Sequence, residues 1–460
     1  MAVNSCVKTA RHVKNPLHAS VFYPILITTN GTPQKGEHQF MEKYLKIFKI
    51  KDLRMKVMTV AFLLVCFRIL SAIPIPGVDK MRLEEFFGSN QLFSFVGVMA
   101  GGTMSNLSII MLGVGPYITA TIIMQLLTMI FPKLKEMYYE EGAAGRAKFN
   151  RYSRYLTLPL AGLQAYGFLN LLASQGVVGH LGVLDLVRNV VVIMAGSMLV
   201  MWIGELISEQ KIGNGISLII FAGIVSGLPK KIVSMIQTYN PSELPTYIGF
   251  IIVALVVIAG VVFINEGERK IPVSYAKQVR GTKMYGGVSS YLPIKVNQAG
   301  VIPIIFAISI LLFPQFVAQI SAIFSKSLSL KLTDFVSQFM NNQYFYSAAY
   351  FLLVVIFTYF YTAVTFDPSE ISKNLQRAGG FIAGIRPGES TTTFLTKVIS
   401  RITLWGAIFL GLIAILPNLV RMFTGIAVLT IGGTAILIVV SVALETLRQV
   451  NSQLMVREYE

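Results

Sequence analysis

The chain has 460 residues, of which 54% are hydrophobic and only 13% charged, and its formal net charge is +17. This composition excludes a single soluble core, because too few polar residues remain to cover so much apolar surface. It indicates a polytopic membrane protein. The two cysteines, Cys6 and Cys66, give no disulfide framework and no sign of redox chemistry.

Residues 1–40 differ in composition from the rest of the chain. They are polar and hold a short apolar run from Ser20 to Ile27 behind a basic flank, which imitates a signal peptide. The run is short, and no small-residue cleavage site follows it cleanly. We expect either a poorly ordered, uncleaved extension or a misassigned start, with Met41 as the alternative first residue.

About ten apolar segments in the remainder are long enough to cross a membrane, which takes roughly 20 helical residues each. They are continuously apolar rather than alternating, which favours helices over a β-barrel. The predicted fold is therefore an all-α polytopic membrane protein. The segments lie near 57–75, 109–131, 155–174, 184–204, 212–229, 247–265, 300–320, 346–366, 400–417 and 423–444.

Basic residues gather in every second connector between these segments. Clusters lie within 43–56, 133–154, 269–295 and 373–401, whereas the other connectors carry far fewer lysines and arginines. Positive charge marks the cytoplasmic side of a membrane protein, so we expect both termini in the cytoplasm. Contact with anionic lipid accounts for part of the basic excess.

The connector and span from Glu266 to Phe306 are the most informative stretch. A strongly basic connector leads at once into an apolar span that contains Gly300 and Pro303. The connector carries more charge than solvation alone requires, which favours a docking surface over a solvated or lipid-touching face. Its cations are Arg269, Lys270, Lys277, Arg280, Lys283 and Lys295.

Motifs for catalysis and for ion-coupled transport are missing. The sequence has no GxxxxGK[ST] or GxSxG motif, and its four histidines are scattered. Ionisable residues inside spans mark ion pathways, yet only Arg68 lies well inside one. We therefore expect no cofactor, no metal and no enzymatic activity. A secondary transporter for a small solute and an intramembrane enzyme stay as rival functions.

Two pairs of isoleucines follow helix-starting Pro and Gly residues at i, i+4 spacing, which places each pair on one helical face. The pairs are Ile118 with Ile122 and Ile216 with Ile220. They either line an apolar constriction, which excludes ions by dewetting, or pack ordinarily against lipid and neighbouring helices. The glycine-rich segment from Phe93 to Leu112 is likewise either broken backbone that points into a pore or a long external loop.

Six separated motifs in order give the chain a close resemblance to the SecY/Sec61 alpha family of protein-translocation channels, from Met41 to Glu460. They are FRILSAIPIPGVD (67–79), GVGPYITATIIMQLL (113–127), KIGNGISLIIFAGIVSGLP (211–229), the stretch 266–306, FIAGIRPGEST (381–391) and GGTAILIVV (432–440).

The resemblance implies ten transmembrane helices in two pseudo-symmetric five-helix halves around an hourglass pore. The halves would be 41–245 and 246–444, with cytoplasmic connectors 266–299 and 367–399 and a cytoplasmic tail 445–460. It also implies a passive, gated conduit in the bacterial inner membrane, through which unfolded secretory chains cross and hydrophobic segments leave sideways into lipid.

The resemblance also implies roles for the residues that occupy matching positions in the motifs. The pore ring would be Ile118, Ile122, Ile216, Ile220, Ile305 and Ile438. The plug would lie within 93–108 and include Phe93, Ser94, Phe95, Val96, Gly97, Val98, Met99, Ala100, Gly101 and Gly102.

The remaining roles concern the lateral gate and the partners. Gln125 and Asn297 would lie at the gate and either bond across it or be satisfied within their own halves. The implied partners are the SecA motor, the ribosome and the small subunits SecE and SecG. The contacts to the motor or ribosome would be Arg269, Lys270, Lys277, Arg280, Arg386, Pro387 and Gly388.

Overall fold

The computed structural model describes residues 50–75, 107–174, 176, 182–237, 244–275, 278–280, 283–285, 289–324, 326–424 and 433–458. The described residues from Met55 onward belong to one compact unit.

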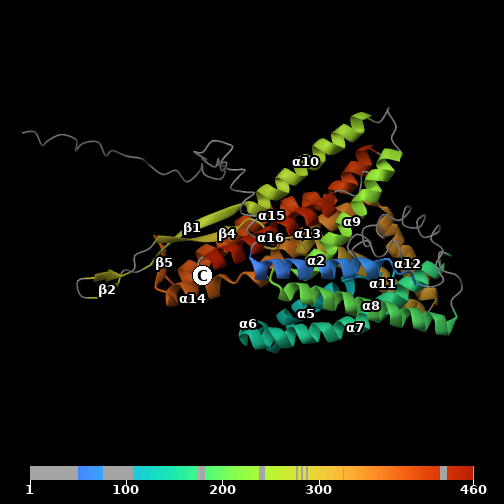
Figure 1. The fold of residues 1–460 in the computed structure, drawn as a ribbon, viewed down its shortest axis with the longest axis horizontal. Helices are drawn as coiled ribbons and strands as arrows, with labels where there is room; N and C mark the ends of the chain where they lie inside the picture. Colours follow the sequence, from blue (N-terminus) through green and yellow to red (C-terminus); the bar gives the residue numbers. More distant parts are fainter. Residues whose placement is uncertain are drawn as a thin grey trace, which may run out of the picture. The chain divides into compact units, whose positions relative to one another are not determined.

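Long helices dominate this unit (Figure 1). Each apolar segment predicted from the sequence overlaps one of them, although the number of membrane crossings stays a prediction. Among the described residues α8, α13, α15 and α16 are long and apolar enough to cross a membrane by themselves. The helices are α2 (Lys51–Ser71), α5 (Gly115–Ile130), α7 (Gly142–Ser174), α8 (Val183–Glu209), α9 (Gly215–Gln237), α10 (Leu244–Glu266), α11 (Ile302–Phe324), α13 (Gln343–Thr365), α15 (Glu389–Thr424) and α16 (Gly433–Glu458).

Three shorter helices lie between the long ones: α6 (Pro132–Tyr139), α12 (Lys326–Asn341) and α14 (Pro368–Arg377). Proline begins both α6 and α14, where its missing N–H costs no hydrogen bond. Asp367 caps α14, because its carboxylate accepts a hydrogen bond from the backbone N–H of Ser369 at 2.8 Å. Each of these two helices therefore starts at a sharp, defined turn after a longer apolar helix.

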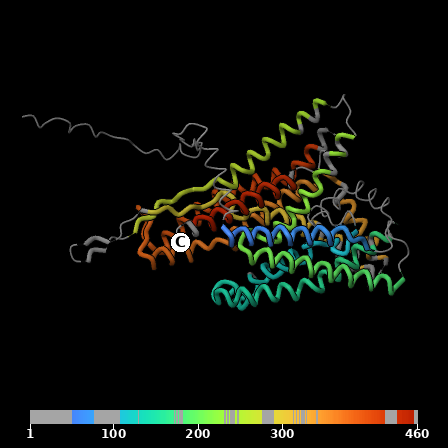
Figure 2. The backbone as a smooth tube through the Cα atoms, in the orientation of Figure 1, coloured from blue at the N-terminus to red at the C-terminus, as the bar shows by residue number. Residues whose placement is uncertain are grey.

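A small antiparallel sheet joins two connectors that are far apart in the sequence. Its strands are β1 (Glu268–Tyr275), β4 (Ser289–Lys295) and β5 (Gly380–Ile382), in the order β4-β1-β5. Ile271 pairs with Leu292 and Val273 with Ile382. Strands β2 (Gln278–Arg280) and β3 (Lys283–Tyr285) pair with each other. The tube in Figure 2 shows β1 and β4 running side by side.

One face of the sheet is fixed to the helices by its own hydrophobic core. Strand residues alternate between faces, and Ile271 and Val273 both point to the buried side. There they meet side chains of α15, including Leu395 and Val398, with Leu375 of α14 alongside. Burial of such side chains stabilises by about 1.5 to 3 kcal/mol each. The sheet is therefore held firmly on α14 and α15.

A second core lies at the C-terminal end of α7 and the N-terminal half of α8. It packs the turn before α5 against α7 and α8 through Ile75, Leu107, Met111, Leu112, Ala165, Phe168, Leu169, Leu172 and Ile193. The contact is close because α8 offers a glycine: a Cβ on Gly196 would lie 2.1 Å from the carbonyl oxygen of Ile109. Only glycine allows the two backbones to approach so closely.

Substitution G196A is therefore expected to lower the thermal midpoint of the purified chain, because backbone must move to admit the methyl group. Overpacking of this kind costs about 1 to 3 kcal/mol. G227A is the matched control, since a Cβ on Gly227 of α9 meets nothing within 4 Å. The midpoints are measured by loss of the monodisperse chain on heating in detergent. Equal midpoints for the two variants would contradict the close contact.

Candidate functional site

The two basic connectors join in one small sheet. Strands β1 and β4 come from the connector after α10, and β5 with α14 comes from the connector after α13. The predicted docking residues Arg269 and Lys270 lie on β1, and Arg386 follows β5 by four residues. The sheet thus brings together side chains that are separated by more than a hundred positions in the chain.

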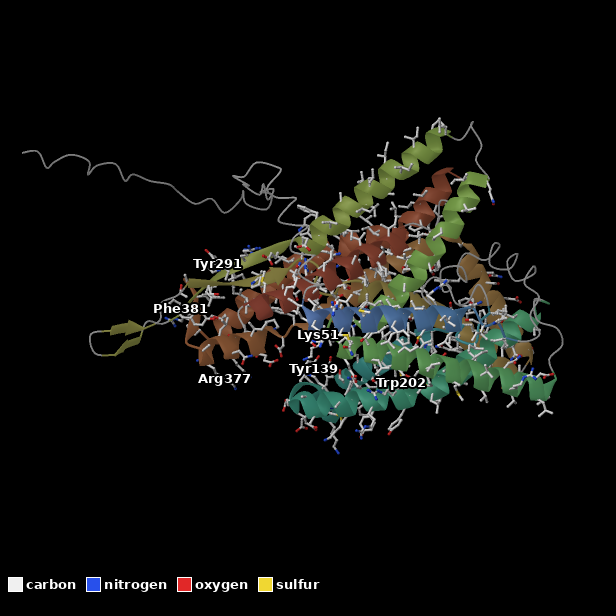
Figure 3. All side chains as sticks on the ribbon, in the orientation of Figure 1. Lys51, Tyr139, Trp202, Tyr291, Arg377 and Phe381 are labelled. Atoms are coloured by element: carbon white, nitrogen blue, oxygen red, sulfur yellow. The ribbon has the colours of Figure 1, made fainter. Side chains whose placement is uncertain are left out.

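Arg269 and Lys270 are neighbours on a strand, so they project to opposite faces of the sheet. Lys270 shares its face with Tyr291, which is 63% exposed, and Phe381, which is 39% exposed. Figure 3 labels both aromatic residues. The ion pair of Lys270 with Glu268, at 3.3 Å, is exposed and contributes little. Phe381 is the first residue of the FIAGIRPGEST motif, but only the pairing of β5 with β1 shows that Phe381 lies on the same face as Lys270 and Tyr291.

The loop after β5 holds Arg386 in an exposed position. Gly384 and Gly388 have φ of +83° and +101°, which other residues adopt only with strain. The hydroxyl of Ser372 in α14 donates to the carbonyl of Gly388 at 2.8 Å, and that of Thr391 donates to the carbonyl of Arg386 at 2.9 Å. The loop is therefore fixed from both sides, while the side chain of Arg386 stays free to meet a partner.

Two further predicted docking residues have no described side chain. Lys277 lies outside the described residues, and Arg280 is described only as the end of strand β2. Their part in docking stays a prediction.

A polar network connects the base of the sheet to α10 and α16. The amide of Asn297 donates to the side-chain oxygen of Asn265 at 2.8 Å and to the carbonyl of Gly300 at 3.2 Å. The amide of Asn265 in turn donates to Ser441 of α16 at 2.7 Å. In addition, Arg448 of α16 pairs with Glu266 at 2.6 Å. The strand β4 thus leads into α11 through a point that is anchored to two other helices.

This network bears on the two alternatives for Gln125 and Asn297, a bond across the gate or partners within their own halves. Among the described residues, the side-chain oxygens of both accept no hydrogen bond, so the two amides are not bonded to each other. The amide nitrogen of Asn297 instead donates to Asn265, which lies in the same half of the chain. For this nitrogen, the second alternative holds. The seam itself is present, since α11 packs against both α5 and α7.

The six isoleucines expected to form a ring lie on four helices, α5, α9, α11 and α16. Ile122, Ile220, Ile305 and Ile438 are buried, with 1 to 6% of their surface exposed. Ile118 and Ile216 are half-buried, and Ile216 lies against Gly204 of α8. Helix α9 contacts α16, and α5 contacts α11. These contacts suit a ring, but that all six meet at one constriction stays a prediction.

Comparison with known proteins identifies the family. The SecY family model matches residues 108–447. The protein translocase subunit SecY of Mycobacterium bovis is 40% identical over 440 residues, which cover 91% of this chain and 99% of that relative. The chain belongs to the SecY family. The resemblance drawn from the six motifs is confirmed.

Solved structures show that the chain has the SecY fold. A structure described as a protein-conducting channel covers 86% of this chain and 92% of its own, with 22% identity and a TM-score of 0.61. Sec61 in a canine ribosome–channel complex from the endoplasmic reticulum matches over the same shares, with 22% identity and a TM-score of 0.59. The predicted fold class of a helical membrane channel is confirmed.

The expected SecY plug, from Phe93 to Gly102, lies outside the described residues. The described chain on either side of it is paired, because Pro74 and Ser108 form an isolated antiparallel bridge. The backbone N–H of Ile75 also donates to the carbonyl of Leu107 at 2.8 Å. The ends of the intervening segment are thus held side by side next to the core of α7 and α8.

Proposed function

We propose that this chain is the central pore-forming subunit of a Sec protein translocase. It provides a passive, gated conduit for unfolded secretory polypeptides across the membrane, with a lateral exit for hydrophobic segments. The observation that carries the proposal is the match along almost the full length of the chain to proteins named as translocase subunits. The fold supports it, because the solved structures with the same fold include a protein-conducting channel.

In this proposal the chain is not an enzyme, and its partners supply the energy for translocation. One face of the joined sheet offers Arg269 for bidentate contacts, suited to carboxylates or to ribosomal phosphates, and the other face offers Lys270 with aromatic rings beside it. This chemistry fits both a motor ATPase such as SecA and the ribosome. The small subunits SecE and SecG would complete the channel against exposed faces of the bundle.

The proposed location is the bacterial inner membrane with both termini in the cytoplasm. The uneven charge of the connectors supports this orientation. It places the sheet, Arg386 and the end of α16 on the cytoplasmic side, where a motor or a ribosome has access. Helix α16 continues without a break from the predicted last span through the predicted tail to Glu458.

The proposed conduit runs between the two halves. Its constriction would be the isoleucine ring, closed from outside by the segment 93–102. Its lateral gate would lie where α5 and α7 face α11 and α13, and Gln125 and Asn297 would be polar residues near that seam. The packing of α11 on α5 and α7 supports this placement.

Reconstitution tests the proposal. The chain is placed in proteoliposomes with SecE, SecG, SecA and ATP, and the fraction of a secretory precursor protected from protease is measured. We expect protection that requires the chain, the motor and hydrolysable ATP. A non-hydrolysable ATP analogue and liposomes without the chain are the controls. Uptake of a small solute by the chain alone, without precursor protection, would instead favour the rival transporter.

A further inference from the structure

A side-chain hydrogen bond connects α6 with the end of α13. The hydroxyl of Tyr139, the last residue of α6, donates to the backbone carbonyl of Val364 at 2.7 Å. Helix α6 lies in the connector between α5 and α7, so it belongs to the first half of the chain. Val364 belongs to the second half. The bond therefore bridges the two halves beside the seam (Figure 3 labels Tyr139).

The ring of Tyr139 is held in place by aromatic neighbours. Tyr138 stands edge-on to Tyr139, with ring centroids 4.9 Å apart, and packs in turn on Phe149 of α7 at 4.8 Å. Burial, and to a smaller degree Tyr138 and Asp367, raises the pKa of Tyr139 above its ordinary value. A tyrosine hydroxyl keeps its proton at neutral pH even at its ordinary pKa, so this hydroxyl can donate.

The acceptor is suited to a bond that forms and breaks. Val364 is next to last in α13, and the last four carbonyls of a helix have no partner within it. Releasing Tyr139 would therefore leave α13 intact. Only Phe366 and Asp367 separate α13 from α14, which packs on β5 and α15. The acceptor thus lies four positions before Pro368, the first residue of α14.

We propose that Tyr139 is a positioning residue that holds the two halves together at the docking end of the seam, and so sets how apolar a signal segment must be to open the lateral gate. A partner that moves α14 would weaken the same bond. This inference rests on the proposed function for its meaning in transport, but the bond itself can be tested on the resting chain.

The structural test measures the distance between α6 and α14 in nanodiscs, without partners. Spin labels are placed at exposed positions by E136C and E370C, with native Cys6 and Cys66 replaced by alanine. We expect Y139F to raise the population of a longer distance roughly two- to tenfold, as the loss of one neutral hydrogen bond allows. Y138F, which removes the adjacent hydroxyl, should leave the distribution unchanged. Identical distributions for Y139F and the parent would overturn the proposal.

The transport test compares two precursors in proteoliposomes, one with its normal signal segment and one in which a polar residue interrupts it. Y139F should raise transport of the interrupted precursor relative to the normal one by a similar roughly two- to tenfold factor. A merely structural defect would lower both together, which would contradict a role in selectivity. Failure of the proposed function would instead abolish transport in every variant while the distance measurement still reports on the bond.

Discussion

Reversing the charge at the docking surface is expected to stop translocation while leaving the channel folded. In the double variant R269E/R386E, two exposed cations on the joined sheet and its loop become anions. Attraction to an acidic or phosphate-bearing partner turns into repulsion, so we expect the initial rate of precursor translocation to fall by about tenfold or more. The rate is measured in proteoliposomes at low and at physiological salt.

The matched control reverses two cations elsewhere. K331E lies in α12 and R188E lies near the start of α8, and both side chains are exposed. This variant carries the same change in net charge and should translocate like the parent. The deficit of R269E/R386E should also depend on salt, because exposed charges are screened. Equal loss in both variants would show that net charge, rather than this surface, controls the rate.

Removing apolar bulk from the predicted ring is expected to make the resting channel leak ions. In I122S/I305S, two buried isoleucines on α5 and α11 become small and polar, so water can enter a constriction that it otherwise avoids. Each isoleucine contributes roughly 2 kcal/mol of hydrophobic free energy, so the ion flux should rise by about tenfold or more. The flux is measured as dissipation of an ion gradient across proteoliposomes.

The control makes the same chemical change on the outside of the bundle. Ile248 and Ile252 lie one helical turn apart on α10, with 51% and 56% of their surface exposed. I248S/I252S should leave the membrane as tight as the parent does, provided that both variants run as monodisperse protein. A leak of equal size in this control would mean that serine loosens the bundle generally, and the ring assignment would lose its support.

The helices could be predicted because each is encoded locally. In lipid, the backbone N–H and C=O groups of a continuous apolar run of about 20 residues find hydrogen-bond partners within the run only if it forms a helix. The ten predicted segments accordingly each overlap a helix. The ends were less well predicted. Helix α16 continues past Glu445 on polar sequence because Val450 and Leu454 still find buried positions. Packing extends that helix where hydropathy no longer indicates it.

The sheet and the polar network could not be predicted because their partners are far apart in the chain. Strand β5 has three residues and pairs with β1 across more than a hundred positions, so no local alternation revealed it. In the same way Asn297 was expected near the gate from its motif, but it lies between β4 and α11 and its partner Asn265 lies on α10. Likewise nothing in the sequence around Tyr139 indicates Val364 as its acceptor.

The central claim is that a polypeptide passes between the two halves, and site-directed crosslinking of a stalled secretory chain tests it most directly. Single cysteines are placed by I118C and I305C, and by L255C on the exposed side of α10, in a background without Cys6 and Cys66. The stalled chain carries one cysteine at the position expected in the membrane. We predict disulfide adducts at Ile118 and Ile305 and none at Leu255. Adducts at Leu255 alone, or none at either ring position in a complex that translocates, would contradict the conduit.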